Sequence, residues 1–517
     1  MSNNVDSRSL AIFRILLGSY LIYDIISRLQ HGKYSLLWYT STAEGSYLDA
    51  DDTPHRSPIH RVWFYRGSAS LQIILFCITF FLGLSFTLGF KCNRFTKTLL
   101  WLNVTAMQCR CMPVHDGSDT YFRHLLLWCT FIPVEKVWSI DSISQNENKG
   151  RETKSDLQKS KVIHIEKGYN TLPIFAVKLQ IVLMYVGTVL HRSLDLYGFS
   201  MKIFQCKWLP PQLTAVHYAL GGSFATRDIA LGDFVRSNIY ISKFMTLTAI
   251  LIEGIAPIMC LVLKKKAYIP QILLVKLHFG LLLLMNLPVA MAATSIFTPT
   301  SMIDKMQRQL SKIFPSTVKN PVPSSPTSMK KKDMDDCTVA KNKKTKRKSK
   351  PFIAYFFFFY MLYDFGGNRN WYKKIDSGDV GEFLRFSQYW VMYSGPPTTT
   401  SHALLTGSIG ETRGINVWQW IKTREIQVVD IEAFQDGEIW TNFTHVYPSP
   451  RFERAMLDWS KIHDKRRTQR LLQGICEVTP FDELTFIVQN LDINPPGIDT
   501  RFSRRRPDTS TSVTCKN

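Results

Sequence analysis

The sequence alternates between long apolar runs and short charged connections, and this alternation limits the possible folds more than any other feature. A helix needs about 20 apolar residues to cross the hydrocarbon core of a bilayer. Five runs approach or exceed that length: 9–29, 69–91, 172–192, 242–263 and 269–285. The mean hydropathy of −0.05 hides them, because the connections carry the charge. We therefore predict an integral membrane protein whose first run is a signal anchor.

Four further runs are shorter or carry charges, so they would need support from neighbouring helices in a membrane. They are 96–114, 119–135, 286–299 and 351–365. Together the runs predict a mainly α fold: a polytopic helical membrane bundle of about eight or nine helices. The mixed, aromatic composition after the last run adds a C-terminal α+β extramembrane domain, with strands expected at 424–432 and 483–488.

The same pattern divides the chain into segments. They are a transmembrane bundle at 1–300, a basic linker at 301–350, a last transmembrane helix at 351–365, an extramembrane domain at 366–494 and a disordered tail at 495–517. The linker opens with an amphipathic stretch at 302–314, which predicts an interfacial helix. Its remainder, 319–350, is rich in Pro, Ser and Lys and is predicted to be disordered.

The formal net charge of +22 does not indicate a nucleic-acid partner. Residues 301–350 alone hold 14 Lys and Arg against four Asp and Glu, and no nucleic-acid motif accompanies them. A basic segment beside a membrane helix instead favours contact with membrane lipids. Protein partners are unknown from the sequence. It indicates no metal, since the Cys109 and Cys111 pair is too closely spaced for a zinc site. Cys476 and Cys515 could pair, but nothing in the sequence requires it.

Basic residues near the helix ends predict the orientation of the chain. Four connections carry them: 91–97, 136–170, 264–266 and 301–350. With nine crossings and a cytosolic N-terminus, all four lie in the cytosol and the C-terminal domain lies in the lumen or outside. The glycosylation sequon at Asn442 would then be usable, whereas the one at Asn103 falls inside a span. We predict the endoplasmic reticulum or another endomembrane as the location.

Several charged residues lie within or near the predicted spans, where a charge is costly unless it faces the bundle interior and finds a partner. They are Arg14, Asp24, Arg110, Arg123, Lys178, Glu253 and Lys276. Structural pairing between helices and a polar cavity for an anionic ligand are equally good interpretations. Arg14 and Asp24 are about 15 Å apart along one helix, so they are not expected to pair with each other.

Several stretches resemble vitamin K-dependent gamma-carboxylase and its HTTM-domain relatives. SLAIFRILLGSYLIYD (9–24) resembles the first helix of the family, and TFIPVEKVWSID (130–141) resembles its fourth-helix region. WLPPQLTAVHYAL (208–220) is similar to the loop after the helix that carries the active lysine. RFSQYWVMYSGPP (385–397) is similar to an element leading into the lumenal region. The order and spacing of these stretches carry the resemblance, since no single one is specific.

The resemblance implies an enzyme that oxidises vitamin K hydroquinone and uses the resulting base to remove a proton from glutamate. Vitamin K hydroquinone is therefore a cofactor that only the resemblance implies. The residues themselves indicate no cofactor. The family lysine corresponds here to Arg192, which follows His191 in Tyr185-Val-Gly-Thr-Val-Leu-His-Arg. Arginine stays protonated and cannot act as the base, and histidine is too weak a base to replace it. His278 matches a later family histidine.

His191, Arg192 and His278 are therefore the candidate site residues, and their catalytic role is unknown. The pair at 191–192 either anchors a helix end or contacts an anion in a retained pocket. We expect a non-carboxylating relative with a lipid- or quinone-sized pocket. The first alternative is a family enzyme acting on an unknown substrate. The second is a transporter, against which the absence of a visible inverted repeat counts.

Overall fold

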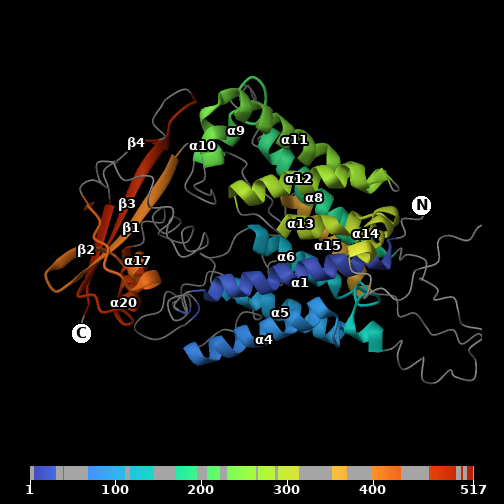
Figure 1. The fold of residues 1–517 in the computed structure, drawn as a ribbon, viewed down its shortest axis with the longest axis horizontal. Coiled ribbons are helices and arrows are strands. Elements are labelled where there is room, and N and C mark those ends of the chain that lie inside the picture. The colour runs from blue at the N-terminus through green and yellow to red at the C-terminus, as the bar shows by residue number, and fades with distance from the viewer. Residues whose placement is uncertain are drawn as a thin grey trace, which may run out of the picture.

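The structure is a computed structural model. It describes residues 5–30, 36, 39, 68–110, 117–144, 171–194, 206–221, 230–263, 266–285, 289–313, 352–368, 399–431, 465–496, 502–504 and 509–515. Within these ranges the chain is mainly helical, with one small antiparallel sheet near the C-terminus. The predicted mainly α class with a C-terminal α+β part is confirmed at this level. The helices run roughly parallel or antiparallel in one layered bundle, and the sheet lies beyond one end of it (Figure 1).

Four helices are long and apolar enough to cross a membrane: α1 (Ser7–Leu29), α4 (Ala69–Leu88), α8 (Leu172–Leu194) and α11 (Ile239–Val262). They coincide with four of the strong runs in the sequence. The other described helices of the bundle region are α5 (Arg94–Arg110), α6 (Gly117–Cys129), α9 (Ala215–Gly221), α10 (Ala230–Ser237), α12 (Tyr268–Met285), α13 (Val289–Thr294), α14 (Thr300–Ile313) and α15 (Phe352–Asn368). These features support an integral membrane protein.

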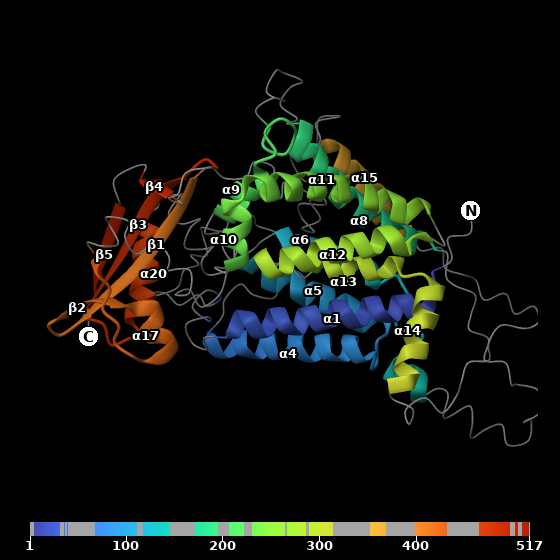
Figure 2. The same cartoon turned by 45° about the horizontal axis from the view of Figure 1, so that its top comes forward.

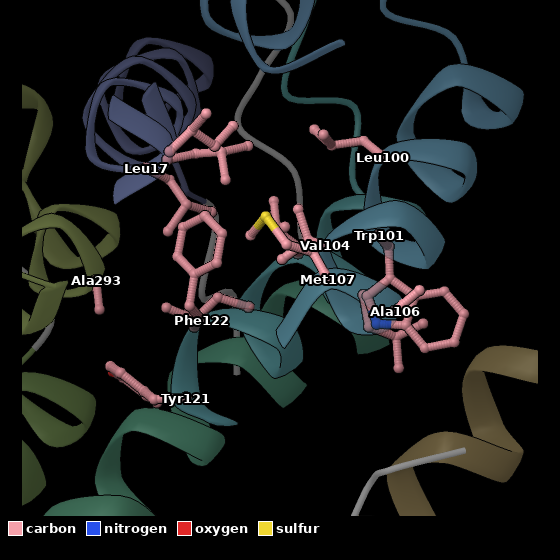
Figure 3. Close-up of a cluster of buried hydrophobic side chains, with 14 of the residues drawn as sticks. Leu17, Leu100, Trp101, Val104, Ala106, Met107, Tyr121, Phe122 and Ala293 are labelled. Carbon is pink, nitrogen blue, oxygen red and sulfur yellow. The ribbon is translucent and has the colours of Figure 1, made fainter. Parts of the chain in front are cut away.

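The bundle core is apolar and closely packed where α1, α5 and α6 meet. Phe122 of α6 reaches toward Leu17 of α1, with Val104 and Met107 of α5 beside them (Figure 3). These four side chains are at most 1% exposed. Burial of these side chains removes apolar surface from water. Within a membrane, the close packing of the same side chains stabilises the helix contacts through dispersion forces.

The described parts of two basic connections, 91–97 and 136–144, lie together at one end of the bundle. Arg14 of α1 donates hydrogen bonds to the carbonyl oxygens of Val134 and Trp138. Asp141 accepts from the backbone N–H groups of Lys91 and Cys92, at 2.9 and 3.0 Å. The turn after α4 therefore lies against the segment after α6. Gly89 makes this approach possible, because it ends α4 at a φ of +67° and any Cβ there would meet Arg14 and Ser139.

The short run 286–299 does not form a full-length membrane helix. Its described part holds α13 and a single 3₁₀ turn, η4 (Ser295–Phe297), because Thr294, Ser295 and Thr298 interrupt the apolar pattern. Gln271 at the start of α12 donates to Thr294 O and to Thr298 Oγ1, at 3.3 and 2.8 Å. The chain therefore returns by Thr298 to the end of the bundle where α12 began.

The amphipathic helix expected at 302–314 is present as α14, which lies across the ends of the other helices (Figure 2). Arg8 of α1 forms an ion pair with Asp304 of α14 at 2.8 Å, which links the two helices. Arg8 forms a second ion pair, with Asp6, at the same distance. Burial raises the pKa of Asp6, but its hydrogen bonds from Arg8 outweigh this and leave that pKa below its ordinary value. The predicted disorder of 319–350 lies outside the described residues.

The sheet has five strands in the order β2-β1-β3-β4, with β5 also paired to β3. They are β1 (Thr399–Ile409), β2 (Thr412–Asn416), β3 (Glu483–Ile493), β4 (Phe502–Arg504) and β5 (Thr509–Thr514), with helices α17 (Val417–Thr423) and α20 (Lys465–Cys476) packed beside them. The predicted strand at 483–488 is confirmed within β3. The one predicted at 424–432 is wrong, because its described part, 424–431, forms only an isolated bridge between Val428 and Ile415.

The tail predicted to be disordered, 495–517, instead supplies β4 and β5. Residues 509–514 pair antiparallel with β3, and Cys515 forms a disulfide with Cys476 of α20. The prediction was wrong because this segment is polar and half exposed, and a polar composition is typical of disordered segments. Its order comes from backbone hydrogen bonds and the covalent link rather than from apolar burial. The C-terminal sheet therefore extends past the predicted boundary at 494.

The sheet touches the bundle at the end opposite the basic connections. Nε2 of His217 in α9 lies 3.0 Å from the carbonyl oxygen of Asn494, directly after β3. Gly221 of α9 packs so closely against Ile493 that a Cβ there would lie 2.5 Å from its Cγ2 atom. The two parts of the chain are therefore docked on each other (Figure 1).

Candidate functional site

Arg192 lies in the last turn of α8, where it forms a buried ion pair with Glu253 of α11. The side chains of Arg192 and Glu253 are 5% and 7% exposed, so water does little to stabilise either charge. The indole ring of Trp208 covers the guanidinium, with 4.3 Å between Cζ and the ring centroid. An arginine suits this site, because its planar group can stack on an aromatic ring while it donates to a carboxylate.

This pairing decides what Arg192 can do chemically. Breaking a buried ion pair by removing one partner usually costs about 3–5 kcal/mol, so the two charges hold each other in place. The guanidinium keeps its proton in proteins and offers no lone pair to accept another. Arg192 is therefore a fixed cation. The sequence showed Glu253 as a charge inside a span, but it could not show which residue Glu253 faces.

His278 of α12 is bonded to the same helix, α8, that carries Arg192. Its Nε2 atom makes a hydrogen bond with the hydroxyl group of Tyr185, about two turns before Arg192 on α8. The ring centroids of these two residues are 5.6 Å apart. Because Tyr185 and Arg192 lie on the same helix, His278 is joined to α8 about two turns from Arg192. The structure thus brings two of the three candidate residues into one cluster, which we call the Arg192 cluster: Tyr185, Arg192, Trp208, Glu253 and His278.

The Arg192 cluster contains one unsatisfied buried atom. Within the described part of the chain, Nδ1 of His278 has no hydrogen-bond partner, although the residue is only 5% exposed. Whichever tautomer is present, Tyr185 satisfies only Nε2. A buried polar atom without a partner costs roughly 1–3 kcal/mol, which a ligand or water could recover.

His191 does not share the position of Arg192. Consecutive residues on a helix are about 100° apart, so neighbouring side chains leave it in different directions. His191 is half-buried, whereas Arg192 is buried. His191 is therefore not assigned to the Arg192 cluster, and its part in a site stays a prediction.

A second polar cluster, which the sequence did not predict, links α1 to α6. Arg28 donates to Asp24 at 2.8 Å, to Asp119 at 2.6 Å and to the hydroxyl of Tyr39 at 2.9 Å. Gln108 of α5 also donates to Asp119. The spacing of Asp24 and Arg28, four residues apart on one helix, was the signal in the sequence that could have revealed the first pair. Arg14 and Asp24 thus have separate partners, as expected.

The remaining candidates have simpler surroundings. Lys178 of α8 lies over the ring of Phe297, with 5.5 Å between Nζ and the centroid. Asn103 is buried within α5 and donates to Leu99 O, which supports the expectation that its sequon is inaccessible. Asn442 lies outside the described residues. Among the residues that the structure describes, no group of three metal-ligating side chains could hold a metal ion.

Comparisons of the chain with protein-family models, with curated proteins and with solved structures find no match.

Proposed function

We propose that this chain is a multi-pass membrane protein of the HTTM kind that does not carboxylate glutamate and that binds a lipid- or quinone-sized molecule. The observation that carries the proposal is the buried pair of Arg192 and Glu253. It occupies the position where the resemblance leads one to expect a lysine. A desolvated lysine can lose its proton and act as a base, whereas a paired arginine cannot.

The Arg192 cluster also has the composition of a ligand site. It combines a cation, an aromatic ring and a buried histidine nitrogen, Nδ1 of His278, that lacks a partner within the described residues. A lipid headgroup could accept or donate a hydrogen bond there, and a quinone oxygen could accept one, while the apolar tail of either molecule lies among the surrounding helices. Vitamin K hydroquinone remains a candidate only through the resemblance.

The proposed topology has nine passes between the two ends of the bundle. Eight are helices, namely α1, α4, α5, α6, α8, α11, α12 and α15, and the ninth is the α13–η4 segment, which brings the chain back without a full-length membrane helix. The N-terminus is cytosolic, and the sheet lies in the lumen of the endoplasmic reticulum or another endomembrane. Two observations support this arrangement. The described parts of the basic connections lie at the end of the bundle away from the sheet. The Cys476–Cys515 disulfide is typical of an oxidising compartment.

An enzyme acting on an unknown substrate is the second candidate. The position of Arg192 about two turns from the His278–Tyr185 pair favours it, since a histidine and a tyrosine can transfer a proton beside a cation that stabilises negative charge. His191 was a third candidate on sequence grounds. Its direction on α8 argues against a part in this site.

Mass spectrometry of extracted lipids and quinones tests the ligand. We expect the purified wild type to retain one class of molecule enriched over the surrounding membrane. His278→Phe should lose it, because the ring nitrogens are gone. His124→Gln, a change at another buried histidine, should retain it. A wild type that carries only the bulk membrane lipids would overturn the proposed pocket.

A further inference from the structure

His217 makes two contacts that a neutral histidine cannot both satisfy. Its Nε2 atom lies 3.0 Å from Asn494 O, and its Nδ1 atom lies 3.0 Å from Arg236 O. Both partners are backbone carbonyl oxygens, which only accept hydrogen bonds. A neutral imidazole has one N–H group, so its other nitrogen would present a lone pair to an oxygen. Only the imidazolium form donates to both.

Both carbonyl oxygens that face His217 stand at the end of a secondary-structure element. Arg236 lies in the last turn of α10, where carbonyl groups have no partner within the helix and carry the negative end of the helix dipole. Asn494 follows the last residue of β3 and presents its carbonyl from the other side. His217 is only 3% exposed, so water does not replace either bond.

We propose that protonated His217 is a pH-sensitive clasp between the membrane bundle and the sheet domain. Acid favours the docked arrangement, because the imidazolium bonds to both α10 and the end of β3. At higher pH the neutral ring keeps one bond and turns a lone pair toward the other carbonyl. The contact with Asn494 and the adjacent packing of Ile493 on Gly221 then weaken.

Other charged or titratable groups lie on the elements around His217. They are Tyr218 on α9, Lys207 before it, Asp233 and Arg236 on α10, Tyr240 and Lys243 on α11, and Asp492 on β3. The ring of Tyr218 meets His217 edge-on at 5.2 Å, and Lys207 lies over Tyr218. Burial lowers the pKa of Lys207 and raises that of Tyr218. Asp233 is within 3.7 Å of Arg236. A variant at His217 itself separates its effect from theirs.

Hydrogen exchange of the full-length protein in lipid nanodiscs tests the clasp. After correction for intrinsic exchange rates, we expect protection in 215–221 and 488–494 to fall on the order of tenfold from pH 6 to pH 8. The His217→Gln variant should lose this pH dependence. His217→Lys, a cation throughout this range, should keep the protection at pH 8.

The control variant is His124→Gln, which alters a buried histidine in α6 and should leave the pH dependence unchanged. Protection in the wild type that does not change between pH 6 and pH 8 would overturn the proposal, even if every variant failed to fold. An unchanged pH dependence in His217→Gln would overturn it as well.

Discussion

At the scale of single residues, the sequence predicted which positions carry charge in the membrane but not how they pair. Arg192 and His278 could be chosen because an arginine replaced an expected lysine and a histidine matched the resemblance. Glu253 and Trp208 could not be assigned to the same cluster, since they lie 61 and 16 positions from Arg192 and only the folded bundle brings them together. The hydrogen bond between Tyr185 and His278 likewise depends on the packing of two helices.

The ion pair predicts a specific pattern of stabilities. Glu253→Gln should lower stability by about 3–5 kcal/mol, because it leaves the guanidinium buried without a counter-charge. Arg192→Met should do the same to the carboxylate. The double variant Arg192→Met/Glu253→Met should be more stable than either single variant, since it leaves no unpaired charge. Thermal unfolding in detergent measures all three. Strictly additive losses would show that the two side chains do not interact.

At the scale of elements, strongly apolar helices were predictable and weakly apolar or polar elements were not. The four long spans followed from run length alone. α9 and α10 are short and lie in a stretch of mixed composition, so no periodic hydrophobic pattern predicted them. β5 was missed because a polar strand held by its neighbour leaves little apolar signal. Local composition thus predicts burial better than it predicts backbone pairing.

The contact between α1 and α4 depends on a small residue. A Cβ at Gly18 would collide with the side chain of Thr87, whereas a Cβ at Gly280 of α12 would meet nothing within 4 Å. Small residues let membrane helices approach closely. Gly18→Ala should therefore lower the unfolding temperature in detergent. Gly280→Ala should leave that temperature unchanged or raise it, because alanine favours helix. Equal effects of the two changes would contradict this account of the interface.

At the scale of the whole molecule, charge and covalent chemistry point to the same arrangement. The described basic connections lie at one end of the bundle, and the disulfide-linked sheet lies at the other (Figures 1 and 2). The basic residues alone predict an orientation of the chain, and that orientation stays a prediction. The docking of the sheet on α9 could not be predicted from the sequence, because it rests on backbone carbonyls and a close glycine contact.

The proposed topology predicts glycosylation on one face of a membrane and protease cleavage on the other. In microsomes, Asn442 should carry a glycan that a glycosidase removes, and Asn442→Gln should abolish it. Protease added from the cytosolic face should cut the basic segment 319–350. A protected basic segment together with an unmodified Asn442 would require the opposite orientation.

Incorporation of carbon dioxide into a glutamate peptide by the purified wild type, supplied with vitamin K hydroquinone, tests the central claim most directly. The claim is that Arg192, paired with Glu253, is a fixed cation and not a base. The account predicts no incorporation above a control without protein. Arg192→Lys tests whether a lysine at this position is sufficient for activity, and the account requires no particular result from it. Incorporation by the wild type that is lost in Arg192→Ala would contradict the account.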